Sequence, residues 1–350
     1  MNKLRASGII IFLTAAGFFL IWLLEYMLAD FVTGGLPKDG FLYTLYPALR
    51  LKMDIWGTQS LMEILASVKF RFLVLAGFGY YLFANSALVA DADFSEKKAV
   101  WLVKLFFILQ LLFVPDLLNE LRLRAQWQAL FQPSGLSVLW LGDFPSYAVF
   151  QFLAILLFGI SAWLVLARWD AGSVYPFLAA LGTLLIWTFL LSVFFGFGKT
   201  DHTYASMFSG MAGMVVFLHI WRSNPAEIGF GFRIFQAFIW CCYFFSGLEK
   251  VFLSGFDWAG SDHLQVLAAL HPGYAADWIS QIPFSGILLG LGLIFQLSSV
   301  LQWRFPNWGY INVAGGVLFH FGTFFLLGIG GYFSPWLAML IFLWPQQGRR

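Results

Sequence analysis

The sequence predicts an all-α, polytopic transmembrane helical bundle of about nine to ten helices, with interfacial helices in its outer loops. Of its 350 residues, 60% are hydrophobic and only 11% are charged, against roughly 45–50% and about 25% in soluble domains. The mean hydropathy is +0.79, and apolar runs long enough to cross a bilayer recur along the chain. We therefore expect residues 1–350 to form a single integral membrane domain whose first partner is the lipid bilayer.

The apolar runs are separated by charged residues, Pro and Gly, and each predicts one span. The first run is too long for a signal peptide and lacks a clean cleavage site, so we expect it to be retained. Backbone groups in lipid must be satisfied within the segment, and the alternation of a β-barrel is absent, so the spans are predicted to be helices. The predicted spans are 8–29, 70–90, 99–115, 147–167, 176–197, 204–221, 234–252, 284–302, 307–327 and a short last run at 334–345.

Three long connections, at about 30–69, 116–146 and 253–283, are rich in aromatic residues. Within them, 43–56 and 121–131 have the composition of amphipathic helices that lie along the headgroups. The distribution of Lys and Arg and the short loops on one side favour a cytoplasmic N-terminus, with the long loops on the outer face. The net charge of +2, without a basic patch, predicts no nucleic-acid partner.

Lys250 is the most informative charged residue, because it lies near the outer end of the seventh predicted span. Its side chain either extends to the headgroups or faces the bundle interior. Neighbouring helix residues do not face each other, so Glu249 does not simply neutralise an inward Lys250. Burial in a dry pocket favours the neutral form of a lysine, and a neutral amine is a general base.

Two histidines fall at the same predicted depth as Lys250 and towards the same face. His202 lies where the chain re-enters the membrane, and His320 lies in the outer half of the ninth span. Each is either a hydrogen-bonded core histidine or a functional one. The histidine and cysteine spacings match no metal site, so no metal is predicted. Signatures of serine hydrolases, dinucleotide-binding folds and P-loops are absent.

Three segments carry a resemblance to a known family. They are "DHTYASMFSGM" (201–211), "YFFSGLEKVF" followed by "DW" (243–258), and "FHFGTFFLLGIGGYFSPWLAMLIFLWP" (319–345). In order and rough spacing they resemble segments of the vitamin K-dependent gamma-carboxylases and the wider HTTM (horizontally transferred transmembrane) group. The resemblance covers about 185–345, which would be the carboxylase-like core of the domain.

The resemblance implies a quinol-dependent modifying enzyme of the carbon–carbon lyase class. Lys250 matches the lysine base that deprotonates reduced vitamin K or menaquinone, with oxygen and carbon dioxide as co-substrates and quinone epoxide as a product. His202 matches the histidine of the carboxylation half, and His320 matches a late histidine that supports the pocket. The motif residues expected to contact the quinone are Tyr243, Gly247 and Trp258.

The sequence departs from the family in two places. Glu249 stands where the animal motif has a second lysine, and no counterpart of the large lumenal substrate-docking region follows the last span. An exported peptide or a small molecule is therefore the expected substrate. The expected location is a bacterial inner membrane, with the site facing outward. A non-catalytic factor for maturation, export or immunity of a secreted peptide is the alternative. A transporter is less favoured because polar groups are scarce in the helix middles.

Overall fold

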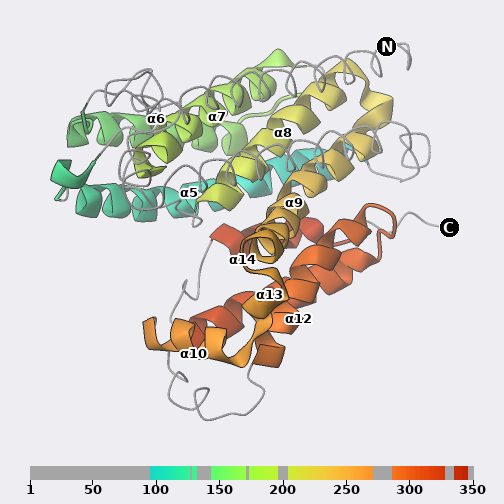
Figure 1. Cartoon of the computed structure of the whole chain (residues 1–350). Helices are drawn as coiled ribbons and strands as arrows, with labels where there is room; N and C mark the ends of the chain where they lie inside the picture. Colours follow the sequence, from blue (N-terminus) through green and yellow to red (C-terminus); the bar gives the residue numbers. More distant parts are fainter. Residues whose placement is uncertain are drawn as a thin grey trace, which may run out of the picture. The chain divides into compact units, whose positions relative to one another are not determined.

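The computed structural model describes residues 95–126, 128–131, 143–170, 173–195, 204–270, 286–327 and 335–345. Within these residues the secondary structure consists of α-helices and short 3₁₀ helices (Figure 1). The predicted all-α fold class is therefore confirmed for the described part. The predicted spans 8–29 and 70–90 and the amphipathic segment 43–56 lie outside it.

Five described helices are long and apolar enough to cross a membrane, which indicates a multi-pass membrane protein. The five candidate spans correspond to α5 (Glu96–Ala125), α6 (Tyr147–Leu166), α7 (Val174–Phe195), α9 (Ile228–Ser254) and α13 (Trp308–Leu327). The predicted count of nine to ten is not reached within the described residues.

Three other predicted spans are helical but are not among these five. α8 (Ala205–Ser223) coincides with the predicted span 204–221. α12 (Gly286–Ser298) continues as the 3₁₀ helix η5 (Ser299–Gln302), and α14 (Pro335–Leu340) continues as η6 (Ile341–Leu343). α14 has only 6 residues, so it covers a fraction of a bilayer's thickness.

α5 extends ten residues beyond the predicted end at 115, so the boundary drawn at Pro115 was wrong. Proline removes one helical hydrogen bond but does not end a helix whose apolar face stays packed. Leu117 and Leu121, one turn apart on the same face, are 0% and 1% exposed. The predicted interfacial helix 121–131 is thus in part the end of α5, and its remainder includes the 3₁₀ helix η1 (Gln128–Leu130).

Backbone contacts divide the chain into two compact units. The first comprises Met1–Ala90, Ala125–Pro145 and Ser192–Thr200; in its described part, the rings of Phe131 and Phe144 meet edge to face at 5.4 Å. The second comprises Asp91–Arg124, Ser146–Leu191 and Asp201–Arg350. The second unit holds the predicted site residues that the structure describes.

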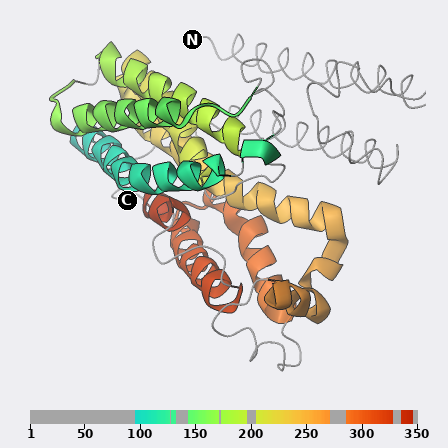
Figure 2. The same ribbon diagram turned by 90° about the vertical axis from the view of Figure 1, so that its left-hand side faces the viewer.

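α8 and α9 run side by side within the second unit (Figures 1 and 2). Small residues of α8 allow this approach, since a Cβ on Gly213 would lie 2.9 Å from Cβ of Phe238 in α9. The hydroxyl of Ser209 donates a hydrogen bond of 2.7 Å to the carbonyl oxygen of Phe238. The small-residue pattern of this segment therefore serves close helix packing.

Buried amides hold the last described turn of the chain against α9 and η5. Gln236 Nε2 donates to the carbonyl oxygen of Phe342 at 2.7 Å, and Gln302 Nε2 donates to that of Leu343 at 2.8 Å. Asn312 Nδ2 in turn donates to Gln302 Oε1 at 2.7 Å. Terminal helix carbonyls lack partners within their own helix, so these side chains satisfy them inside the bundle.

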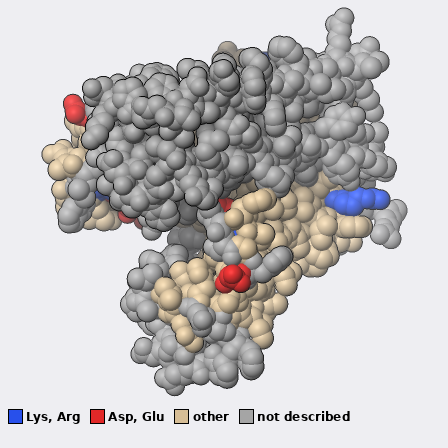
Figure 3. Space-filling model, viewed as in Figure 1, with Lys and Arg blue, Asp and Glu red and all other residues tan. Residues whose placement is uncertain are grey.

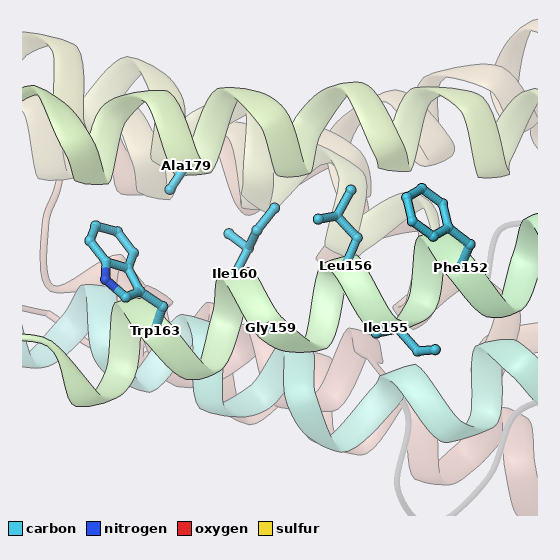
Figure 4. A pocket seen from close by; sticks show the side chains of 7 residues that line it. All are labelled: Phe152, Ile155, Leu156, Gly159, Ile160, Trp163 and Ala179. Atoms are coloured by element: carbon cyan, nitrogen blue, oxygen red, sulfur yellow. The ribbon is translucent and has the colours of Figure 1, made fainter.

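Large apolar side chains are exposed on the outer faces of the helices, as expected for surfaces that meet lipid. Ile155 and Leu318 are 71% and 73% exposed. On the face visible in Figure 3, the described surface is mainly uncharged, with a few isolated acidic and basic side chains. An apolar groove of about 370 Å³ lies along α6, lined by Phe152, Ile155, Leu156, Gly159, Ile160, Trp163 and Ala179 (Figure 4).

Candidate functional site

One face of α9 carries the polar and aromatic residues of the candidate site. Tyr243, Ser246, Gly247 and Lys250 follow the spacing i, i+3, i+4 and i+7, which places them along a single stripe of the helix. The stripe is about 10 Å long, since each helical residue rises about 1.5 Å. α9 therefore presents two groups of side chains, one around Tyr243 and one around Lys250.

The side chain of Lys250 turns back along α9. Its Nζ donates to the hydroxyl oxygen of Ser246 at 2.7 Å and to the carbonyl oxygen of Ser246 at 3.2 Å. Long helical side chains lean towards the N-terminus of their helix. In α9 this direction points away from the C-terminal end at Ser254, which is the end nearest Lys250. The half-buried amine is thus held one turn back along the helix, at Ser246.

Trp258 covers the same amine from the far side of a turn. Nζ of Lys250 lies 5.2 Å from the centre of the Trp258 ring, within the range of a cation–π contact. The turn begins at Gly255, whose φ of 59° and ψ of −151° are open to glycine and strained for other residues. The 3₁₀ helix η4 (Gly255–Ala259) then carries Trp258 back towards α9.

His263 joins this group from α10 (Ser261–Leu270), where its ring centre lies 5.5 Å from that of Trp258. His263 falls in the predicted connection 253–283, for which the sequence leaves open a solvated outer loop or the rim of a pocket. The structure shows a helix there, and the His263 side chain is half-buried. The folding of the connection into η4 and α10 brings His263 near the site.

Gln296 of α12 approaches the stripe where α9 has a glycine. A Cβ on Gly247 would lie 2.9 Å from Cβ of Gln296, so the glycine permits the two helices to meet closely. Nε2 of Gln296 lies 3.5 Å from the hydroxyl oxygen of Ser246. Gln296 is 2% exposed, and the signal that could have found it is a glutamine inside an apolar run.

The second group on the stripe is built around a phenol–imidazole hydrogen bond. The hydroxyl of Tyr243 and Nε2 of His320 in α13 are 2.9 Å apart, and the tautomer of the ring decides which group donates. Tyr243 is 2% exposed. Its ring meets Phe295 edge to face at 5.2 Å, and Trp336 of α14 stacks on His320 at 5.9 Å. Residues of four helices, α9, α12, α13 and α14, thereby meet at the Tyr243–His320 pair.

The structure brings the predicted residues together in pairs. Lys250 lies with Trp258, Tyr243 lies with His320, and Gly247 lies between the two pairs at the contact with α12. His202 is outside the described residues, so the predicted convergence of Lys250 with both histidines stays a prediction. Within the described ranges, no three His, Cys, Asp or Glu residues are close enough to hold a metal ion.

No protein-family model, curated protein or solved structure gives a match to this chain. The resemblance of 185–345 to the gamma-carboxylases thus rests on the three sequence segments alone. The local geometry around Lys250 and Tyr243 is an observation independent of that resemblance.

Proposed function

We propose that the protein is a multi-pass membrane enzyme of the gamma-carboxylase-like HTTM type, in which Lys250 is the general base. Lys250 removes the proton from a hydroxyl of a reduced membrane quinone, vitamin K or menaquinone. The product of the enzyme is an exported peptide or small molecule modified by carboxylation or a related reaction. The observation that carries the proposal is the amine of Lys250, turned back to Ser246 at 2.7 Å instead of extended along the helix end.

The contacts of Lys250 suit an amine that gains a proton. The carbonyl oxygen and hydroxyl oxygen of Ser246 accept hydrogen bonds from Nζ, and the face of Trp258 attracts a cation. Glu249, the preceding residue, acts on Lys250 through its charge, whereas the two oxygens of Ser246 and the ring of Trp258 are uncharged. These groups orient Nζ and its lone pair before proton transfer, and they stabilise the ammonium that forms afterwards. Both effects are what a general base requires.

The side chains around Lys250 also fit a quinol. A flat ring with polar oxygens needs aromatic walls and a few hydrogen-bonding groups. Trp258 supplies an aromatic face beside the amine, and the carboxamide of Gln296 is buried nearby, with its Oε1 lacking a partner in the described part of the chain. A bound quinol would supply an acidic hydroxyl and, with oxygen and carbon dioxide, the chemistry of the modification.

The remaining predicted residues have supporting roles in this proposal. The hydrogen bond between Tyr243 and His320 fixes the part of the α9 stripe that faces α13 and α14. His202 is assigned to the carboxylation half by the resemblance alone. The site faces outward from a bacterial inner membrane with a cytoplasmic N-terminus, an orientation that rests on the loop lengths and charges of the sequence.

The test is an assay for quinone epoxide. The purified protein in lipid nanodiscs is supplied with reduced menaquinone or vitamin K, oxygen and bicarbonate, and the epoxide is measured by chromatography. We expect epoxide from the wild type and a loss on the order of 10²-fold or more in Lys250→Met. Lys104→Met is the matched control, because Lys104 is another half-buried lysine within an apolar helix, α5. Absence of epoxide from the wild type would contradict the proposal.

A further inference from the structure

Four glutamines are buried inside the described helices. Gln110, Gln236, Gln296 and Gln302 are each 7% exposed or less. An amide taken out of water costs free energy unless both its nitrogen and its oxygen find partners. The hydrogen bonds of these side chains therefore show which amides the fold satisfies by itself.

Gln110 is satisfied at both ends. Its Nε2 donates to the hydroxyl of Ser161 at 2.6 Å, and its Oε1 accepts from the indole nitrogen of Trp187 at 3.1 Å. Gln302 is likewise satisfied, donating to the Leu343 carbonyl at 2.8 Å and accepting from Asn312 at 2.7 Å. These amides link helices, and their hydrogen bonds explain their presence in an apolar interior.

Gln296 is different. Its Nε2 makes one long contact of 3.5 Å with Ser246 Oγ, and its buried Oε1 has no hydrogen-bond partner among the described residues. The nitrogen and oxygen of an amide can be exchanged in assignment. Exchanging them here gives Oε1 the contact with Ser246 and leaves Nε2 without one. In either orientation, one buried polar atom of Gln296 is unsatisfied.

The unsatisfied amide adjoins the proposed base. The hydroxyl oxygen of Ser246 contacts both Nζ of Lys250, at 2.7 Å, and Nε2 of Gln296, at 3.5 Å. Nζ of Lys250 and Nε2 of Gln296 therefore contact the same oxygen atom, Oγ of Ser246. The close approach of α12 to Gly247 fixes the backbone of Gln296 at this position. A ligand that reaches Lys250 along the stripe therefore meets the carboxamide of Gln296 as well.

We propose that Gln296 is a ligand-recognition residue, whose carboxamide oxygen accepts a hydrogen bond from a hydroxyl of an aromatic diol bound beside Lys250. This inference rests on the proposed function, because it assigns the diol to the same site. It adds a specificity determinant that selects the reduced, hydroxyl-bearing ring over a ring whose oxygens carry no hydrogen. A site built to bond a hydroxyl rejects the analogue that lacks it, because its own polar atom is then left unpaired.

The test compares two probes with the same ring. 2-Methyl-1,4-naphthalenediol carries two hydroxyls, and its dimethyl ether carries none. Dissociation constants are measured under argon by calorimetry on the full-length protein in nanodiscs. We expect the wild type to bind the diol about tenfold more tightly than the ether, the effect of one buried hydrogen bond. In Gln296→Met and Gln296→Leu, the preference falls to about twofold or less.

Gln110→Met is the matched control, since it removes a buried glutamine whose hydrogen bonds are made to Ser161 and Trp187 and not to the Lys250 group. It is expected to lower the thermal midpoint of unfolding more than Gln296→Met does and to keep the tenfold preference. Equal binding of the two probes by the wild type would mean that water satisfies Gln296, and this result would overturn the inference. So would an unchanged preference in both Gln296 variants.

The inference and the proposed function fail separately. If the preference for the diol depends on Gln296 but the wild type forms no epoxide, the proposed base chemistry is wrong and the recognition role of Gln296 is retained. If epoxide formation depends on Lys250 but neither probe is preferred, the recognition role is wrong and the base chemistry is retained.

Discussion

Two buried polar networks in the second unit differ in how completely they are satisfied. Around Gln110, the hydroxyl of Ser161 and the indole of Trp187 take up both amide atoms, and Ser161 also donates to the carbonyl of Leu157 at 2.7 Å. Around Lys250, the contacts with Ser246 leave the amide of Gln296 unsatisfied in the described structure.

This difference separates two uses of polar residues in an apolar bundle. The Gln110 network joins α5, α6 and α7 and is complete without a ligand, so we infer a structural role for it. The Lys250 network joins α9 and α12 and keeps hydrogen-bonding capacity unused. Fold stability should therefore depend mainly on the first network, and activity mainly on the second.

The largest expected effect is on activity, at Lys250. Lys250→Arg places a permanent positive charge beside Trp258, but a guanidinium does not give up its proton and is no general base. We expect epoxide formation to fall on the order of 10²–10⁴-fold, while the free energy of unfolding changes by less than about 1 kcal/mol. An arginine variant with wild-type turnover would show that charge, and not proton transfer, is what the site needs.

The next effect is on stability, at the two glutamines. Gln110→Leu leaves the indole N–H of buried Trp187 without its acceptor, and we expect the free energy of unfolding to fall by about 2–3 kcal/mol. Gln296→Leu removes an amide that is already half satisfied, so the expected loss is below about 1 kcal/mol. Both are measured by denaturant titration in mixed micelles. Equal losses would erase the distinction between the two networks.

A smaller effect is expected at the turn that places Trp258. Gly255→Ala forces an alanine into a backbone conformation suited to glycine, and the expected loss is about 1–2 kcal/mol. The loss is conformational, because nothing lies within 4 Å of the added methyl group. Gly290→Ala in α12 is the control: its Cβ would make only an ordinary contact of 3.8 Å with Ala259. That helical substitution should raise stability by up to about 1 kcal/mol.

The smallest effect is expected at the phenol–imidazole pair. Tyr243→Phe keeps the ring contacts with Phe295 and Trp336 but removes the hydrogen bond to His320, and we expect a loss of about 0.5–1.5 kcal/mol. A double-mutant cycle with His320→Phe isolates the pairwise contribution. Additive losses in that cycle would show that the 2.9 Å contact contributes nothing to the fold.

The helical fold and many span positions could be predicted from the sequence, because apolar runs bounded by charge and proline specify membrane helices directly. The predicted spans 147–167 and 307–327 agree with α6 and α13 to within a residue at each end. The end of α5 was missed because proline is a strong local signal, whereas the burial of Leu117 and Leu121 is a property of the packed bundle.

The candidate site was predicted less completely, for a geometric reason. Sequence gives the depth of a residue along a helix but not the rotation of the helix, so Lys250 could be placed near a histidine's depth without its neighbours being known. The contact between Lys250 and Ser246 could have been predicted, since residues four apart share a helix face. The contacts made by three other residues depend on how α12, α14 and α10 pack against the site, which the sequence does not show; these residues are Gln296, Trp336 and His263.

The amides that bind the carbonyls of Phe342 and Leu343 also bear on how the protein is made. Gln236 and Gln302 leave the ribosome well before Phe342 and Leu343, whose carbonyls they bind. Until those residues arrive, each glutamine lacks its native acceptor, at a cost of about 1–3 kcal/mol if it is already buried. Closure of this part of the bundle therefore waits until residues 342 and 343 have been synthesised, and a nascent chain halted before residue 342 would carry two amide N–H groups without their native acceptors into the membrane.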